Sequence, residues 1–315
     1  MADVALTGAG GFLGWHTRAA LRESDAQVAT VQVGERFDAD AAAKAISGAS
    51  RVIHLAGVNR ATDAEVRDGN AAFAQQLGEA LGRADNPPAT VVYANSTQAS
   101  NGTTYGEAKA EAGRVLAAAA ATVGAEFVDL RLPNLFGEHG RPFYNAVTAT
   151  FCHLLAMGEQ PNVQQDKELT LLHAQDAADL LTGHVPTAQQ STLEQHETVS
   201  GLLRRLRAQA QTYRAGEIPD VASKFDRDLF NTYRSYTFPA QAPVKLTRHA
   251  DARGSFFEII RTHGGPGQSS FSTTAPSISR GDHFHRRKVE RFTVLAGQAR
   301  ISLRRLFTAE VFDFD

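Results

Sequence analysis

The chain begins with a repeating pattern of short apolar runs and alanine-rich amphipathic stretches, which continues from Asp3 to Arg131. The apolar runs have the length of buried strands and lie at residues 4–7, 27–33, 52–56, 90–95 and 127–131. Residues 115–121 are mostly alanine, which favours a helix. Strands that alternate with helices in this way are typical of a parallel sheet covered by helices. The pattern predicts a doubly wound α/β domain.

The pattern changes in the last third of the chain. Residues 203–238 are polar and charged with scattered aromatic side chains, and we expect them to form helices that complete the first domain. Pro239 and Pro243 suit neither a helix nor a central strand, so they mark a linker. Beyond it, short β-rich pieces at 256–261, 292–295 and 300–306 are separated by glycine and proline. The sequence predicts a first domain over 1–238, a linker over 239–245 and a small all-β domain over 246–315.

Composition and charge narrow the classes of function. Of 315 residues, 43% are hydrophobic and 21% are charged, as in ordinary globular proteins. The formal net charge of -2 gives no basic field for a nucleic acid or an anionic membrane. No apolar run approaches the ~18 residues of a membrane span. The single cysteine, Cys152, excludes a disulfide framework and fits a reducing cytoplasm. We expect a cytoplasmic protein with no nucleic-acid or membrane partner.

A glycine-rich turn follows the first predicted strand. The run TGAGGFLG supplies the candidate cofactor-binding residues Thr7, Gly8, Gly11, Phe12, Leu13 and Gly14. Glycines here permit a tight turn and a close approach of backbone N–H groups to a pyrophosphate, and the start of the next helix favours the anion. A glycine triplet alone also fits a flexible turn. Its position at the first strand–helix junction favours a dinucleotide site.

The end of the second strand decides between NAD and NADP in this type of site. A carboxylate there accepts a hydrogen bond from the ribose 2′-hydroxyl, whereas an arginine pairs with a 2′-phosphate. The chain offers both groups, in Glu35 and Arg36, and both side chains also fit a solvated loop. We favour NADP, bound through Arg36, and keep NAD as the alternative.

A tyrosine and a lysine, Tyr105 and Lys109, lie four residues apart and therefore on one face of a predicted helix. A nearby ammonium favours the phenolate, so Tyr105 can transfer a proton while a hydride moves to or from a nicotinamide. Ser96, at the end of a predicted strand upstream, is the hydroxyl best placed to hydrogen-bond the reacting carbonyl. Such a tyrosine–lysine pair alone is more often a surface feature. The preceding glycine-rich turn and the strand-end serine favour a catalytic site.

These motifs, in this order, resemble the extended short-chain dehydrogenase/reductases, which are built on a Rossmann-type sheet. The resemblance covers about residues 1–240 and includes the glycine spacing GxxGxxG, the YGEAK run, and the HLAG and RLPNLFG runs. It implies that Lys109 also holds the nicotinamide ribose. It implies further cofactor contacts from Leu55, Ala56, Gly57 and Asn70, the last of which is expected to open a helix. The one departure is Ala108, where the family usually has serine.

The same resemblance implies where a sugar nucleotide binds. The candidate substrate-binding residues are Ser96 and Thr97 after the fourth predicted strand and Asn134 after the fifth.

Two runs beyond the linker, DARGSFFE and RGDHFH, resemble strand signatures of the dTDP-4-dehydrorhamnose 3,5-epimerases, which are cupins. The resemblance implies that Arg253 binds nucleotide phosphates and that His283 is a base. The spacing of His283, His285 and Glu290 also resembles a cupin metal motif, and two imidazoles on one strand face with a nearby carboxylate form a partial zinc site. The surrounding arginines and lysine leave a solvated basic loop as the alternative.

Together, the two parts resemble bifunctional enzymes of capsular polysaccharide synthesis, which join an extended reductase to a cupin. This resemblance implies an NADPH-dependent reductase of a UDP-4-keto-6-deoxy-N-acetylhexosamine, with epimerisation beside the ketone in the cupin. Only about 70 residues follow the linker and the second cupin motif is absent, so we expect an incomplete cupin-like domain that binds zinc weakly and pairs in a homodimer. The alternatives are a sugar-nucleotide 4-epimerase that keeps NAD bound and a cofactor-binding regulator without turnover.

Overall fold

The computed structural model describes residues 2–252 and 254–315. The chain forms two compact units. The first contains the residues up to 136 together with 143–146 and 168–197, and the second contains 137–142, 147–167 and 198–315. The chain therefore passes between the two units several times before residue 198.

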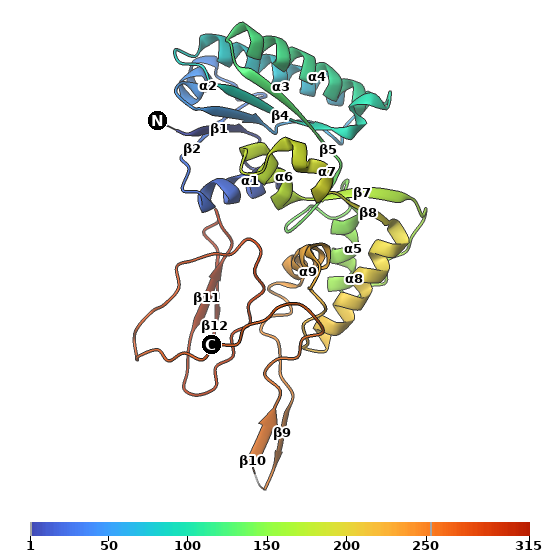
Figure 1. Cartoon of the computed structure of the whole chain (residues 1–315), viewed down its shortest axis with the longest axis vertical. Helices are drawn as coiled ribbons and strands as arrows, with labels where there is room; N and C mark the ends of the chain where they lie inside the picture. Colours follow the sequence, from blue (N-terminus) through green and yellow to red (C-terminus); the bar gives the residue numbers. More distant parts are fainter. Residues whose placement is uncertain (1, 253) are drawn as a thin grey trace. The chain divides into compact units, whose positions relative to one another are not determined.

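A five-stranded parallel sheet forms the centre of the first unit (Figure 1). Its strands follow the order β2 (Val28–Val31), β1 (Val4–Thr7), β3 (Arg51–His54), β4 (Thr90–Ser96) and β5 (Glu126–Leu132). Every neighbouring pair is parallel. The strand order reverses at β1, and ligands of such sheets bind beyond the carboxyl ends of the strands at this point. The predicted doubly wound Rossmann-type sheet is confirmed.

Helices cover both faces of this sheet. One face packs against α1 (Phe12–Glu23) and α6 (Ala174–Thr182), and the other packs against α2 (Ala39–Ile46), α3 (Asp63–Arg83) and α4 (Thr104–Thr122). Successive residues of a strand point to opposite faces. Val52 accordingly packs on the α2–α4 face and its neighbour Ile53 packs on the α1 and α6 face, both with 0% of their surface exposed. The helix predicted over 115–121 lies within α4.

A smaller sheet follows β5 in the chain. It contains β6 (Asn134–Phe136), β7 (Glu168–His173) and β8 (Gln195–Thr198), with β6 and β7 parallel. Short helical turns occur at two places in the first unit: η1 (Thr97–Ser100) lies between β4 and α4, and η2 (Thr187–Gln189) and α7 (Gln190–Leu193) lie between α6 and β8.

The helical part of the second unit consists of α5 (Val147–Ala156), α8 (Val199–Arg214) and α9 (Lys224–Thr237). Both α8 and α9 pack against α5, and Leu206, Phe230 and Tyr233 are fully buried. Helices are thus present over most of 203–238, but they belong to the second compact unit and not, as expected, to the first. Residues 239–245 form turns and irregular backbone, and the linker role of this segment stays a prediction. None of the helices in the described part of the chain has both the length and the apolar character needed to cross a membrane.

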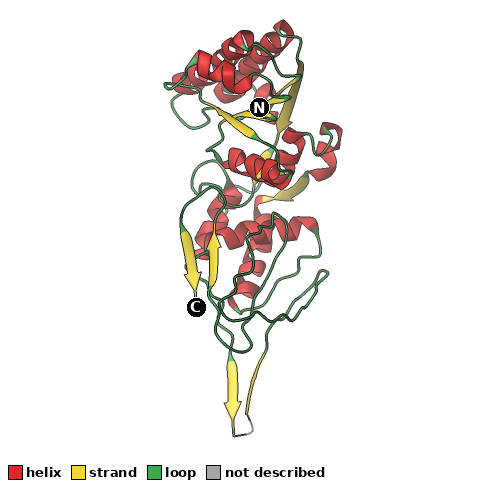
Figure 2. Ribbon diagram, turned by 90° about the vertical axis from the view of Figure 1, so that its left-hand side faces the viewer, coloured by secondary structure: helices red, strands yellow, loops and turns green. Residues whose placement is uncertain are grey.

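The C-terminal part of the second unit is a small β region with two antiparallel hairpins. One pairs β9 (Arg248–Asp251) with β10 (Gly254–Phe257), and the other pairs β11 (Ile301–Arg304) with β12 (Val311–Phe314). In Figure 2 these strands are connected by long loops. The strand predicted over 292–295 is wrong, because 258–300 contains no strand, and the strands predicted over 256–261 and 300–306 are shorter than expected. Alternating apolar residues form a strand only where a neighbouring strand is available for pairing.

Candidate active site

The glycine-rich turn between β1 and α1 is compact because its glycines have no side chains. Gly8 has φ +68, and a Cβ at this position would lie 2.7 Å from the Ala56 nitrogen. The Gly11 nitrogen donates to the Gly8 carbonyl oxygen at 3.0 Å. A Cβ on Gly14 would overlap that same oxygen. The turn therefore brings the start of α1 against the end of β1 and forms a cradle that fits a pyrophosphate.

Thr7 fastens the end of β1 to the segment after β3. Its Oγ1 accepts hydrogen bonds from the Leu55 nitrogen at 3.1 Å and the Ala56 nitrogen at 3.2 Å, and it is hydrogen-bonded to His54 Nδ1 at 2.9 Å. Burial lowers the pKa of His54 to about 3, and the nearby charge of Lys109 contributes to this shift. This imidazole is therefore neutral at neutral pH and acts as a structural group.

Asn70 shapes the segment that follows β3. Its side chain donates to the Val58 and Val66 carbonyl oxygens, each at 2.7 Å. The expectation that Asn70 opens a helix is wrong, because α3 begins at Asp63 with a capping box in which Thr62 and Glu65 satisfy each other's backbone N–H groups. The Thr62-x-x-Glu65 spacing is the sequence signal for that start.

A pocket of about 530 Å³ lies beside the glycine-rich turn. It is lined by Gly8, Ala9, Gly10, Arg18, Thr30, Val31, Gln32, Val33, Ala56, Gly57 and Phe73. Three of the predicted cofactor-binding residues are thus part of its wall. Thr7, Gly11, Gly14, Leu55 and Asn70 do not line the pocket themselves. Leu13 packs against the core cluster on the α1 and α6 face of the sheet. Phe12 contacts the ring of His16, with ring centroids 5.1 Å apart. Arg36 and Glu35 are exposed and do not line the pocket.

Ser96 and Tyr105 meet at the carboxyl end of β4. Their side chains lie close enough to interact. Burial raises the pKa of Tyr105, and the interaction with the Ser96 hydroxyl offsets part of that shift. The next residue, Gly106, lets α4 begin directly against η1, since a Cβ there would overlap the Gln98 carbonyl oxygen. The close packing of α4 on η1 places the Tyr105 phenol beside Ser96, and burial keeps that phenol protonated.

Lys109 lies one helical turn after Tyr105 and is buried, with 5% of its surface exposed. Its Nζ donates to the Ala94 carbonyl oxygen at 2.7 Å and lies 4.1 Å from the centre of the Tyr93 ring. Burial lowers the pKa of Lys109 to about 7, and the charge of Asp129 acts in the opposite direction. Asp129 is in turn held by Asn95 Nδ2 at 2.7 Å. Sequence reasoning missed Tyr93 and Asp129 as supports of Lys109.

The predicted sugar-nucleotide residues lie at strand ends. Thr97 is the first residue of η1 and is exposed. Asn134 is also exposed, and its Nδ2 donates to the Thr170 carbonyl oxygen at 3.1 Å, which connects β6 to β7. Arg253 lies outside the described residues. The structure thus brings Ser96, Tyr105 and Lys109 together and leaves the substrate roles of Thr97 and Asn134 as predictions.

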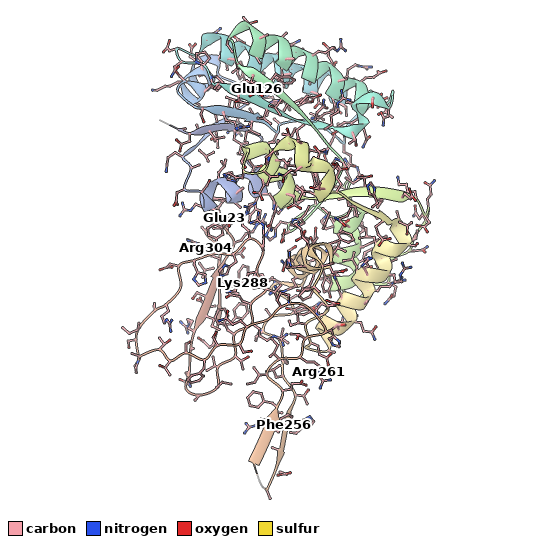
Figure 3. All side chains as sticks on the ribbon, viewed as in Figure 1. Glu23, Glu126, Phe256, Arg261, Lys288 and Arg304 are labelled. Atoms are coloured by element: carbon pink, nitrogen blue, oxygen red, sulfur yellow. The ribbon has the colours of Figure 1, made fainter. Side chains whose placement is uncertain are left out.

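Three potential metal ligands converge in the C-terminal β region. We call His283, His285 and Glu290 the histidine cluster, and their ligand atoms lie within 4.8 Å of one another. The prediction that the two histidines share a strand face is wrong, since this segment is irregular. Glu290 also pairs with Lys288 at 2.6 Å, and this hydrogen bond is the main cause that lowers the pKa of Glu290. Lys288 is labelled in Figure 3. The three side chains suit zinc, although the ammonium competes for the carboxylate.

Two protein families match this chain. The NAD dependent epimerase/dehydratase family matches residues 4–191, and the polysaccharide biosynthesis C-terminal domain matches residues 249–315. A UDP-2-acetamido-2,6-beta-L-arabino-hexul-4-ose reductase from Pseudomonas aeruginosa is 30% identical over 98% of this chain and 85% of its own length.

Solved structures agree with these matches. The capsular polysaccharide assembling protein CapF from Staphylococcus aureus has 30% identity and a TM-score of 0.70, over 82% of this chain and 72% of its own. A UDP-glucose 4-epimerase from Thermotoga maritima shares the fold at 16% identity, with a TM-score of 0.60 over 74% of this chain and 98% of its own. The resemblance to capsular polysaccharide enzymes is therefore confirmed. This chain belongs to the NAD-dependent epimerase/dehydratase family and carries a polysaccharide biosynthesis C-terminal domain.

Proposed function

We propose that this protein is an NADPH-dependent reductase of a UDP-4-keto-6-deoxy-N-acetylhexosamine in the synthesis of capsular or surface polysaccharide precursors. The observation that carries the proposal is the placement of Ser96 and Tyr105 next to each other and beside the buried Lys109, at the carboxyl end of the sheet that also bears the glycine cradle. The reductase of Pseudomonas aeruginosa, which is similar along nearly the whole chain, supports the choice of substrate.

The residues of the site fit the cofactor and the reaction. When bound, NADPH supplies the hydride that reduces the ketone carbon. Ser96 donates a hydrogen bond to the carbonyl oxygen, and Tyr105, protonated because burial raises its pKa, gives its proton to that oxygen as the alcohol forms. Lys109 holds the nicotinamide ribose and stabilises the phenolate that Tyr105 leaves behind.

The proposal includes a preference for NADP(H). Arg36, exposed just beyond β2, offers a positive charge near the adenosine end of the pocket. Gly8, Gly14, Ala56 and Gly57 hold the pyrophosphate side. We further propose that the reaction takes place in the cytoplasm, because the single cysteine, Cys152, is fully buried and free.

The C-terminal β region has a separate proposed role. The histidine cluster binds zinc weakly, with His283 placed as the base of an ancestral epimerisation beside the ketone. The region exposes large apolar side chains such as Phe256, Phe271 and Phe292, and each of its hairpins is a two-stranded sheet with no further strand among the described residues. The edges of such sheets favour strand pairing with a second copy of the chain, so we propose a homodimer.

Mass spectrometry of the products tests the main proposal. The protein is incubated with NADPH, deuterated at the transferable position, and a UDP-4-keto-6-deoxy-N-acetylhexosamine. We expect one deuterium in the sugar and consumption of one NADPH per product. A parallel incubation with a UDP-N-acetylhexosamine that carries a hydroxyl at C4 tests the alternative, since inversion at C4 without net NADPH consumption would identify a 4-epimerase. Cofactor binding with no product at all would identify a regulator.

A further inference from the structure

Arg18 is placed to read the adenosine end of the cofactor. It lies on α1 four residues after Gly14, so the two residues share the helix face that meets the glycine-rich turn. Its side chain lines the pocket of about 530 Å³ together with Gly8 and Gly10 on one side and residues 30–33, which end and follow β2, on the other. The ring of Phe73 contributes a further wall. A guanidinium therefore occupies the place where β1, α1 and β2 converge.

The charge of the side chains that line this pocket favours a cofactor with a 2′-phosphate. Arg18 is the one charged side chain among the eleven described residues that line it, and none of the eleven is a carboxylate. A site for NAD typically has a carboxylate at the end of the second strand, where it accepts from the ribose 2′-hydroxyl. Here the corresponding segment has the neutral Gln32, which can donate to a phosphate oxygen. The lining therefore attracts a 2′-phosphate and offers no repulsion to it.

The turn after β2 explains why its own charges do not line the pocket. Gly34 has φ +90, a left-handed conformation that favours glycine. Gln76 of α3 clamps this residue at both backbone groups: its Oε1 accepts from the Gly34 nitrogen at 2.6 Å and its Nε2 donates to the Gly34 oxygen at 3.2 Å. The Phe37 nitrogen also donates to that oxygen at 3.0 Å. The turn is fixed so that Glu35 and Arg36 are exposed outside the lining.

We propose that Arg18 binds the 2′-phosphate of NADP(H) and is the main determinant of cofactor preference in this chain. A planar guanidinium donates two parallel hydrogen bonds to a phosphate, which is stronger and more directional than a single contact. Partial burial, which lowers the pKa of Arg18, places this charge in surroundings where electrostatic attraction is stronger than in water. Arg36 contributes from the rim. The inference rests on the proposed function, since it assumes that NADPH is the cofactor.

Binding measurements without sugar substrate test the assignment. Dissociation constants for NADPH, NADH, 2′,5′-ADP and ADP are measured by calorimetry for the wild type, Arg18→Ala, Arg18→Lys, Arg36→Ala and Arg22→Ala. Arg22 lies on the same helix, one turn further on, and is exposed, so it is the matched control. We expect Arg18→Ala to weaken NADPH and 2′,5′-ADP by about 10- to 100-fold, as for loss of charged hydrogen bonds. NADH and ADP should change by less than about twofold. Arg18→Lys should lie between, and Arg36→Ala should lose less than Arg18→Ala.

Three outcomes would overturn the proposal: equal losses for NADPH and NADH in Arg18→Ala, a larger loss in Arg36→Ala, or a wild type that binds both dinucleotides equally. Thermal unfolding followed by circular dichroism shows whether Arg18→Ala folds. If it does not, Arg18→Lys, which retains the charge, still tests the proposal. Failure of the proposed function has a different signature. In that case the dinucleotides bind with the expected preference, and no hydride reaches the keto sugar.

Discussion

The catalytic groups at the end of β4 and the histidine cluster differ in how the fold holds them. Ser96, Tyr105 and Lys109 lie on a strand end and a helix that pack against each other, and each has a partner within the first unit. The cluster lies in irregular backbone, with His283 and His285 exposed. The first set is already arranged for its chemistry, whereas the second depends on an ion or a further ligand to fix it.

The two sites also differ in how deeply their charged groups are buried. Lys109 is 5% exposed, and its pKa falls from 10.5 to about 7 because the charged form loses its hydration. Charges in such a place act strongly on their neighbours, while charges at an exposed site are screened by water. We therefore expect substitutions near β4 to change the reaction far more than substitutions in the cluster.

The largest effect is expected for Tyr105→Phe. This change removes the proton donor and keeps the ring, so turnover should fall by at least ~100-fold, a typical loss for general acid catalysis. NADPH affinity should barely change. Single-turnover reduction of the keto sugar measures the first quantity and calorimetry the second. Tyr144→Phe is the control, because Tyr144 is bonded to Asn59 and not to Ser96. Near-normal reduction by Tyr105→Phe would show that another group supplies the proton.

Gly14→Ala should have the next largest effect. Its Cβ would overlap the Gly8 carbonyl oxygen, so the backbone of the cradle must shift, at a cost of about 1–3 kcal/mol in the free energy of unfolding. Both NADPH and NADH should bind more weakly. Gly82→Ala in α3 is the matched control: no atom lies within 4 Å of its Cβ position, and alanine should raise the free energy of unfolding by about 0.5–1 kcal/mol. Urea unfolding distinguishes the two, and unchanged cofactor binding in Gly14→Ala would argue against the cradle.

Asp129→Asn should shift the pH dependence of the reaction. Asp129 opposes the fall in the pKa of Lys109, so its loss should lower that pKa further. Lys109 is charged only below its pKa, and the alkaline limb of kcat/KM should therefore move to lower pH, with up to about a tenfold loss on the alkaline side for each pH unit moved. Glu126→Gln is the control, because Glu126 lies on the same strand and does not influence the pKa of Lys109. An alkaline limb that does not move would show that the ionisation of Lys109 does not cause the fall in kcat/KM at high pH.

The same shift predicts how stability depends on pH. Because the folded pKa of Lys109 lies near 7 and the unfolded value near 10.5, the unfolded chain holds one more proton between these limits. The free energy of unfolding should thus rise with pH across this window. Denaturant unfolding of the cofactor-free protein tests this, and Lys109→Met should abolish that part of the dependence.

Local patterns predicted the parallel sheet, the glycine cradle and the set of Ser96, Tyr105 and Lys109, because strand periodicity and helix spacing determine each of them. The position of Arg18 in the pocket was missed, although its spacing from Gly14 is readable. The exclusion of Glu35 and Arg36 from the lining was also missed, because it depends on how Gln76 holds the Gly34 turn across 42 residues of sequence. The strand expected around His283 was wrong for a related reason, because strand formation depends on pairing that no local pattern specifies.

The smallest effect on reduction is expected for the histidine cluster. His285→Ala should change the rate by less than about twofold, since the catalytic groups and their partners all belong to the first unit. The same change should remove what zinc the protein binds. Three ligands without a fourth bind zinc weakly, and Lys288 already occupies one oxygen of Glu290. His249→Ala, on the exposed β9, is the control.

Lys288→Ala sharpens this last prediction, because it acts in the opposite direction. Removing the ammonium frees the Glu290 carboxylate and takes away a repulsive charge, so zinc affinity should rise. Metal content after purification without added zinc, zinc titrations, and solvent-deuterium incorporation beside the ketone without NADPH measure the outcome. Stoichiometric metal with rapid incorporation in the wild type would contradict the expectation, since it would require a complete, working epimerase site. Weak zinc binding that tightens in Lys288→Ala and vanishes in His285→Ala would show that the three side chains act together even in irregular backbone.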